Sequence, residues 1–280
     1  MKRFLVLLAG LAVALSAMAA DAPGPDWAYM TPDPSASAPV SGRQAAPTDQ
    51  QPGAPAVVVS GNGAGAPACS LCHGASGVGG PQSANLRGQD AEYIVRQMKD
   101  FKGGARGGPL SGGGAIAKAL TDAETAEAAK HYAGLNPMRS ARIIESTNAP
   151  KTTVGRDSQR IKLPGNETEP LGKRIVEFAE ASPEAPFAAY VPVGSLAAGK
   201  LVVDGSKSEE CESCHGDGLK GSHDIPLLAG RSPVYIARQL YSFKNGLRTG
   251  GDADVMKITI SDLNDDDIIA AAAYIGSLDP

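Results

Sequence analysis

The sequence is poor in the side chains from which a large apolar core is built. Aromatic residues make up 5% of the 280 residues, with one tryptophan and five phenylalanines, whereas the chain contains 34 glycines and 21 prolines. In small folding units such a composition leaves a core of protein side chains alone marginal in stability. The sequence therefore predicts small units that need a further source of apolar packing.

Long apolar runs are also scarce. The most prominent covers residues 4–15, follows Lys2 and Arg3, and precedes the small residues 17–19. This order is typical of a secretory signal peptide, and the run is shorter than the roughly 20 apolar residues that a membrane-spanning helix needs. We expect residues 1–19 to be a cleaved signal peptide and the mature chain to be a soluble periplasmic protein, with an uncleaved anchor as the alternative.

Cysteine is rare, and all four copies fall in two Cys-x-x-Cys-His motifs, CSLCH at 69–73 and CESCH at 211–215. Disulfides, a zinc or redox pair, and covalent attachment of a c-type haem are the three candidate explanations. Disulfides leave the histidine after each second cysteine unexplained, and the flanks lack the strand–helix–strand context of a thioredoxin-type pair. Haem attachment explains every member, with two thiols for the haem vinyl groups and an adjacent imidazole for the iron. The predicted attachment residues are Cys69, Cys72, Cys211 and Cys214, and the predicted iron ligands are His73 and His215.

The two motifs lie in a tandem duplication. Adding 142 to any number from 69 to 108 gives the matching position of the second copy without a gap, so that Leu86 matches Leu228 and Gln97 matches Gln239. The copies define one unit at 60–136 and another at 195–280. Residues 20–59 are rich in proline, alanine and glycine and are expected to be disordered, and the proline-rich residues 137–194 are expected to be a linker with a short packed piece at 175–178.

The periodicity within each unit is helical. Apolar spacings of three and four predict amphipathic helices over 90–101 and 234–243. Helix-capping patterns at 121–124 and 264–267 begin a last helix in each unit. A helix over 196–203 precedes the second motif, whereas residues 57–59 offer only a short counterpart. We therefore predict an all-α fold of two small helical domains, each wrapped around a covalent haem.

These motifs resemble the class I cytochromes c, and the duplicated form is similar to the dihaem cytochrome c4 family. The resemblance covers both units and rests on Cys-x-x-Cys-His-Gly, Leu-x-Gly-(five residues)-Tyr-Ile-x-Arg-Gln, and Phe-Lys-x-Gly-x-Arg before a capped last helix. It implies two covalently bound haem c groups, with His73 and His215 as proximal ligands. It also implies a distal methionine between the Phe-Lys-x-Gly-x-Arg segment and the last helix, a role that Met256 matches in the second unit.

The first unit departs from this pattern. Counting back from Leu120 and Leu263 puts Gly113 opposite Met256, so the first haem lacks the expected sulfur ligand. An open or water-bound iron is one interpretation. A ligand from elsewhere in the chain is the other, and the candidates are Met30, Met138, Lys118 and His131, while Met98 is expected to be core packing.

Two arginines at matched positions, Arg106 and Arg248, are candidates for pairing with haem propionates, because a guanidinium suits a carboxylate. Residues 69–136 hold seven Lys/Arg and six Asp/Glu, a net charge of +1, and residues 195–280 hold eight against thirteen, a net of −5. The acidic second unit favours a basic redox partner and argues against nucleic acid.

The predicted function is single-electron transfer in the periplasm between a dehydrogenase or quinol-oxidising complex and a terminal acceptor. Donor and acceptor proteins, or a dehydrogenase of which this chain is the cytochrome subunit, are the expected partners, and any membrane association would come through a partner. The alternative is a dihaem oxidoreductase of the peroxidase or thiosulfate dehydrogenase type, with the haem of the first unit as the catalytic site.

Overall fold

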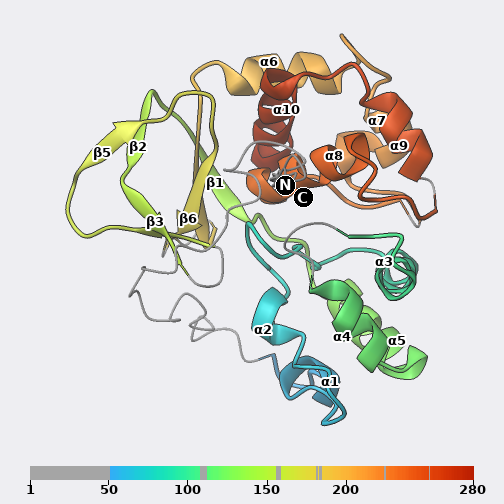
Figure 1. Cartoon of the computed structure of the whole chain (residues 1–280). Helices are drawn as coiled ribbons and strands as arrows, with labels where there is room; N and C mark the ends of the chain where they lie inside the picture. Colours follow the sequence, from blue (N-terminus) through green and yellow to red (C-terminus); the bar gives the residue numbers. More distant parts are fainter. Residues whose placement is uncertain are drawn as a thin grey trace, which may run out of the picture.

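The computed structural model describes residues 51–107, 112–155, 159–180, 182, 185–223, 225–251 and 253–280. The predicted signal peptide, most of the predicted arm and Met30 lie outside these residues. The described chain forms two helical units and a set of short strands between them, and Figure 1 shows the strands to one side of the two stacked helical units. In the part of the chain that is described, no helix is long and apolar enough to cross a membrane.

Unit 1 consists of five helices around a small apolar core. Tyr132 and Ile94 are buried in this core, and a full capping box between Thr121 and Glu124 begins the last helix, as the sequence predicts. Val57 and Val58 are also buried there, so the expected disordered arm is wrong for residues 51–59, and we count unit 1 as residues 51–136. Its helices are α1 (Ala56–Val59), α2 (Ser70–His73), α3 (Ala91–Gly103), α4 (Gly113–Ala119) and α5 (Asp122–Ala133).

Unit 2 repeats this order with a longer first helix. Asn264 and Asp267 form the capping box of its last helix, and Ile236 and Ile268 lie in its core. The helices are α6 (Ser195–Val203), α7 (Glu212–His215), the 3-10 turn η1 (Asp217–Leu219), α8 (Pro233–Lys244), α9 (Ala253–Thr259) and α10 (Asp265–Ser277). The helix expected over 196–203 and its short counterpart in unit 1 are therefore confirmed.

The first and last helices of unit 2 cross at Gly199. A Cβ atom at this position would overlap the carbonyl oxygen of Ala270 and lie 2.7 Å from Cβ of Tyr274. The close approach of α6 and α10 thus depends on the missing side chain.

We expect Gly199→Ala to push α6 from α10 and to lower the free energy of unfolding by roughly 1–3 kcal/mol, the usual cost of overpacking. Thermal unfolding followed by circular dichroism measures the change. Leu201 lies on the same helix with its side chain largely exposed, so Leu201→Ala is the control and should change stability by less than about 0.5 kcal/mol. An unchanged melting temperature in Gly199→Ala would contradict the role of this contact.

The segment between the units is folded into strands, so the all-α prediction and the description of 137–194 as a linker are corrected. Five strands form one mixed sheet in the order β1-β7-β6-β4-β3, and β2 and β5 pair separately. The strands are β1 (Ala141–Glu145), β2 (Asn148–Pro150), β3 (Thr152–Val154), β4 (Arg160–Lys162), β5 (Thr168–Pro170), β6 (Val176–Ala179) and β7 (Phe187–Val191). Strands of three to five residues separated by prolines are too short for their alternation to be recognised in the sequence. The packed piece expected at 175–178 is confirmed, because Ile175, Val176 and Phe178 are buried.

This sheet packs against unit 2. Strand β1 lies beside α10, and Ala141, Phe187 and Val191 belong to the same buried cluster as the core of unit 2. The buried carboxylate of Glu177 accepts hydrogen bonds from Ser232 Oγ at 2.7 Å and from the backbone N of Val234 at 3.1 Å. The insertion therefore shares a core with unit 2 and holds the beginning of α8.

Candidate haem-binding sites

Each Cys-x-x-Cys-His motif forms one short helical turn. Cys69 and Cys211 stand at the N-cap positions of α2 and α7, and the backbone N of each histidine donates to the carbonyl of the first cysteine at 3.0 Å. A spacing of three residues places both thiols of a motif on one side of the turn. Gly74 follows the first histidine with φ +71° and ψ 154°, a conformation that glycine adopts at little cost.

The two histidines are oriented in the same way. His73 Nδ1 lies 2.8 Å from the carbonyl oxygen of Ala84, and His215 Nδ1 lies 3.0 Å from that of Pro226. A carbonyl can only accept, so Nδ1 carries the proton in each ring, and the unprotonated Nε2 is the nitrogen that can ligate a metal. Burial lowers the pKa of His215, which keeps that ring in the neutral form required for ligation.

The four cysteines are free thiols, so the disulfide explanation has no support in the structure. Burial raises the pKa of the Cys69 thiol, and it raises the pKa of Cys211 to about 11. A redox-active pair needs a thiol whose pKa is lowered. Nor do the described residues contain a group of three or more His, Cys, Asp or Glu arranged to hold a metal ion. Thiols on one side of a turn, next to a histidine with a fixed ring, are the donor set that covalent haem attachment requires.

The structure shows which residue of unit 1 lies at the position matched to Met256. Met256 is the fourth residue of α9, half-buried against the core of unit 2. The matching helix α4 has Ile116 as its fourth residue, half-buried in the same way. Gly113 instead begins α4, where a Cβ would lie 2.7 Å from the ring of Phe101. The expected pairing of Gly113 with Met256 is therefore replaced by a pairing with Ile116, which also lacks sulfur.

The other candidate ligands of unit 1 lie in different surroundings. Lys118 is exposed on α4, and His131 Nε2 lies 3.2 Å from the carbonyl oxygen of Ala75, close to the motif histidine in sequence. Met98 packs against the core from α3, as expected, and Met138 is half-buried beyond α5.

The matched arginines meet at the interface between the units. Arg106 donates to Gln97 at 2.8 Å and, across the interface, to Tyr235 at 2.8 Å and Gln239 at 3.0 Å. Arg248 mirrors it, donating to Gln239 at 2.9 Å and to Gln97 at 2.8 Å. Each guanidinium also lies over a phenylalanine ring of its own unit. We call this set the arginine hub; its role toward haem propionates stays a prediction.

Two buried polar groups were missed by the sequence reasoning. Gln89 contacts the backbone of unit 2, and Glu177 lies beneath α8. Neither belongs to a motif, although Gln89 follows a matched glycine and the copies differ in charge at this position, where unit 2 has Arg231.

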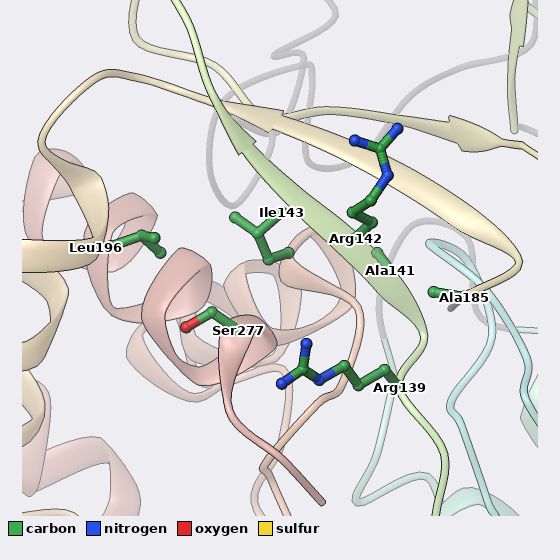
Figure 2. A pocket seen from close by; sticks show the side chains of 7 residues that line it. All are labelled: Arg139, Ala141, Arg142, Ile143, Ala185, Leu196 and Ser277. Atoms are coloured by element: carbon green, nitrogen blue, oxygen red, sulfur yellow. The ribbon is translucent and has the colours of Figure 1, made fainter. Parts of the chain in front are cut away.

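A small cavity of about 120 Å³ lies between β1 and the end of α10, with two arginines at its edge (Figure 2). Arg139 pairs with Asp279 and Arg142 with Glu180, both at 2.6 Å. Their charges are already compensated, so this cavity is not assigned as a binding site.

Two helical units, each with Cys-x-x-Cys-His on a short turn and a histidine ring fixed through Nδ1, define a tandem c-type cytochrome. No family model matches the chain. It is 27% identical to cytochrome c4 of Azotobacter vinelandii over 221 residues, which cover 75% of this chain and 84% of the relative. It is also 27% identical to a thiosulfate dehydrogenase electron acceptor of Stutzerimonas stutzeri, over 75% of this chain and 79% of the relative. Cytochrome c-554(548) of Halomonas halodenitrificans is 35% identical over 81 residues, which are 29% of this chain and 98% of that protein.

Solved structures agree on the fold. The thiosulfate dehydrogenase TsdBA of Marichromatium purpuratum superposes with a TM-score of 0.58 at 24% identity, over 80% of this chain and 39% of that one. Reduced cytochrome c4 of Pseudomonas stutzeri gives a TM-score of 0.50 at 21% identity, over 75% and 93%.

The chain belongs to the cytochrome c4-like family of dihaem class I cytochromes c. It is an electron-transport protein with two covalently bound haem c groups.

Proposed function

We propose that this protein is a periplasmic carrier of single electrons, exported by cleavage after residue 19, with one haem bound in each unit. In this proposal Cys69 and Cys72 hold the first haem and Cys211 and Cys214 the second. The observation that carries the proposal is the repeated motif in which a backbone carbonyl fixes Nδ1 of His73 and of His215. Haem supplies reversible one-electron oxidation and reduction of iron, and the chain supplies the axial ligands and the surroundings that set the potential.

The two haems are proposed to differ in their sixth ligand. Met256 would complete the coordination of the second iron, while Ile116 offers no donor atom at the matched position of unit 1. Methionine ligation raises a haem potential relative to ligation by two nitrogens. Electrons would therefore pass from the first haem to the second.

The donor is proposed to be a dehydrogenase that oxidises sulfur compounds. Two relatives carry the name thiosulfate dehydrogenase electron acceptor, and a third is the cytochrome subunit of a sulfide dehydrogenase. The net charge of −5 on residues 195–280 would suit a basic docking face, and such an encounter weakens as salt is added.

The test is to produce the mature chain with the haem-maturation machinery and to count covalently bound haem. We expect two haems per chain, and one when Cys69 and Cys72 are both replaced by alanine. Reduction of the loaded protein by a purified thiosulfate dehydrogenase, followed in a stopped-flow spectrometer, then tests the donor. One haem per wild-type chain would refute the dihaem assignment, and failure of the dehydrogenase to reduce the protein would refute the proposed donor.

The second candidate function is catalysis at the first haem, favoured by Ile116 at the position of the distal ligand. In that case the loaded chain, without any dehydrogenase, would turn over peroxide when supplied with a chemical reductant, or thiosulfate when supplied with an electron acceptor. Absence of turnover together with rapid reduction by a dehydrogenase would leave electron transfer as the function.

A further inference from the structure

One pair of matched positions at the interface carries different side chains. Gln89 of unit 1 corresponds to Arg231 of unit 2 in the 142-residue register, and both are buried, with 6% and 2% of their surfaces exposed. Each side chain crosses to the other unit. The two side chains differ in their contacts with the backbone segment whose carbonyl binds the motif histidine of the other unit.

Gln89 pairs with the backbone of Leu227 through two hydrogen bonds. The backbone N of Leu227 donates to Gln89 Oε1 at 3.1 Å, and Gln89 Nε2 donates to the carbonyl oxygen of Leu227 at 2.6 Å. The N–H of Leu227 belongs to the same peptide group as the carbonyl of Pro226, which accepts the proton of His215 Nδ1. A single peptide group therefore connects a side chain of unit 1 to the motif histidine of unit 2.

This connection has a chemical consequence for the imidazole. A hydrogen bond accepted from the N–H of a peptide increases the negative charge on the carbonyl oxygen of the same peptide, because hydrogen bonds in a chain polarise one another. A stronger acceptor at Nδ1 makes the ring more basic toward a metal at Nε2. A more basic axial ligand favours ferric over ferrous iron and so lowers the reduction potential.

The matched residue of unit 2 cannot act in this way. An arginine side chain has only donors, and Arg231 gives them to the carbonyl oxygens of Arg87 at 2.8 Å and Leu227 at 3.3 Å. It offers no acceptor to the peptide between Ala84 and Asn85, whose carbonyl holds His73. Nδ1 of each histidine thus donates to a backbone carbonyl. Of these two peptide groups, only the one that holds His215 also donates its N–H to a side chain of the other unit.

We propose that Gln89 is a positioning residue for the second haem: it acts across the domain interface, through the Pro226–Leu227 peptide, to hold His215 and to lower the potential of that haem. The proposal rests on the assignment of His215 as an axial ligand. It makes the potential of one haem dependent on a side chain of the other unit.

The test compares Gln89→Leu with Gln89→Glu in the fully loaded chain. Leucine removes the acceptor, so the reduction potential of the second haem should rise. The ratio of reduced to oxidised haem at a fixed applied potential should increase by up to about tenfold, which corresponds to about 59 mV for one electron. Glutamate keeps the acceptor, so the potential should stay or fall. Potentials are measured by spectroelectrochemical titration, and the wave that moves in Met256→Ala identifies the second haem.

A spectroscopic readout separates positioning from loosening of the fold. The NMR shift of the His215 Nδ1 proton in the reduced protein should move toward that of a weaker hydrogen bond in Gln89→Leu and not in Gln89→Glu. Asn85→Leu is the control: it removes a buried amide at the position matched to Leu227, where it contacts Met138 and Ser140, and should leave the second haem unchanged.

Three results would overturn the proposal: an unmoved second potential in Gln89→Leu, equal shifts of both haems, or shifts of the same sign in the two Gln89 variants. Each of these can occur with two haems attached, in which case the proposed function stands. A wild-type chain that attaches no haem in unit 2 would reject both.

Discussion

Replacing Met256 by alanine is expected to make both haems bind carbon monoxide in the reduced protein, where the wild type binds it at one. The half-buried thioether on α9 is the proposed sixth ligand of the second haem, and alanine supplies no donor atom. The potential of that haem should fall at the same time, because methionine ligation favours ferrous iron. Absorption spectra recorded with and without carbon monoxide, together with a redox titration, measure both changes.

The reverse substitution gives a matched control. Ile116 holds on α4 the place that Met256 holds on α9. Ile116→Met should therefore supply a sixth ligand to the iron of the first haem, abolish its binding of carbon monoxide and raise its reduction potential. Met98→Leu should change neither, because Met98 packs in the core from α3. A wild-type protein that binds no carbon monoxide would show that another residue ligates the first iron.

Glu177→Gln is expected to stabilise the protein above neutral pH by up to roughly 3 kcal/mol. Burial raises the pKa of Glu177 from an ordinary 4.5 to about 7, although its hydrogen bonds from Ser232 and Val234 oppose the rise. At about 1.4 kcal/mol for each pKa unit, this difference corresponds to roughly 3 kcal/mol. Glutamine resembles the protonated carboxyl and can still accept both hydrogen bonds.

The pH dependence follows from the direction of the change. Between pH 4.5 and about 7 the folded chain keeps a proton at Glu177 that the unfolded chain releases, so stability falls as the pH rises through this range. Denaturant unfolding of wild type and variant at several pH values should show curves that agree below pH 4.5 and separate as the pH rises to 7. Glu167→Gln on the exposed side of the insertion is the control, with a change of less than about 0.5 kcal/mol. Parallel curves for Glu177→Gln would contradict the prediction.

The parts of this fold that repeat could be predicted, and the part that occurs once could not. The motif residues and the amphipathic helices appear twice in the 142-residue register, and the capped last helix appears twice with an offset of 143, so each copy supported the prediction for the other. Strands such as β3 and β4 have three residues each, too few for a local periodicity to be recognised, and β1 pairs with β7, whose residues lie 46 positions later in the chain. The position of unit 1 that matches Met256 illustrates a second limit. Counting back from the last helix predicts Gly113, whereas the structure matches Ile116, because the loops on either side of α4 and α9 differ in length.

The contacts across the interface depended on tertiary structure in the same way. Arg106 and Arg248 were recognised as a matched pair, but their position opposite one another follows from how the units pack. Gln89 carries no motif, and its significance appears only when Leu227 and Pro226 lie beside it.

The arginine hub has the form of a twofold-symmetric dimer contact within one polypeptide. Arg106, Gln97 and Tyr93 on the face of unit 1 correspond to Arg248, Gln239 and Tyr235 on the face of unit 2, as the two faces of an isologous interface do. In a dimer of identical chains every substitution would occur on both sides at once. Because both faces here belong to one polypeptide, a substitution can change one face alone. The two sides of a self-complementary contact can therefore become different, as Gln89 and Arg231 are.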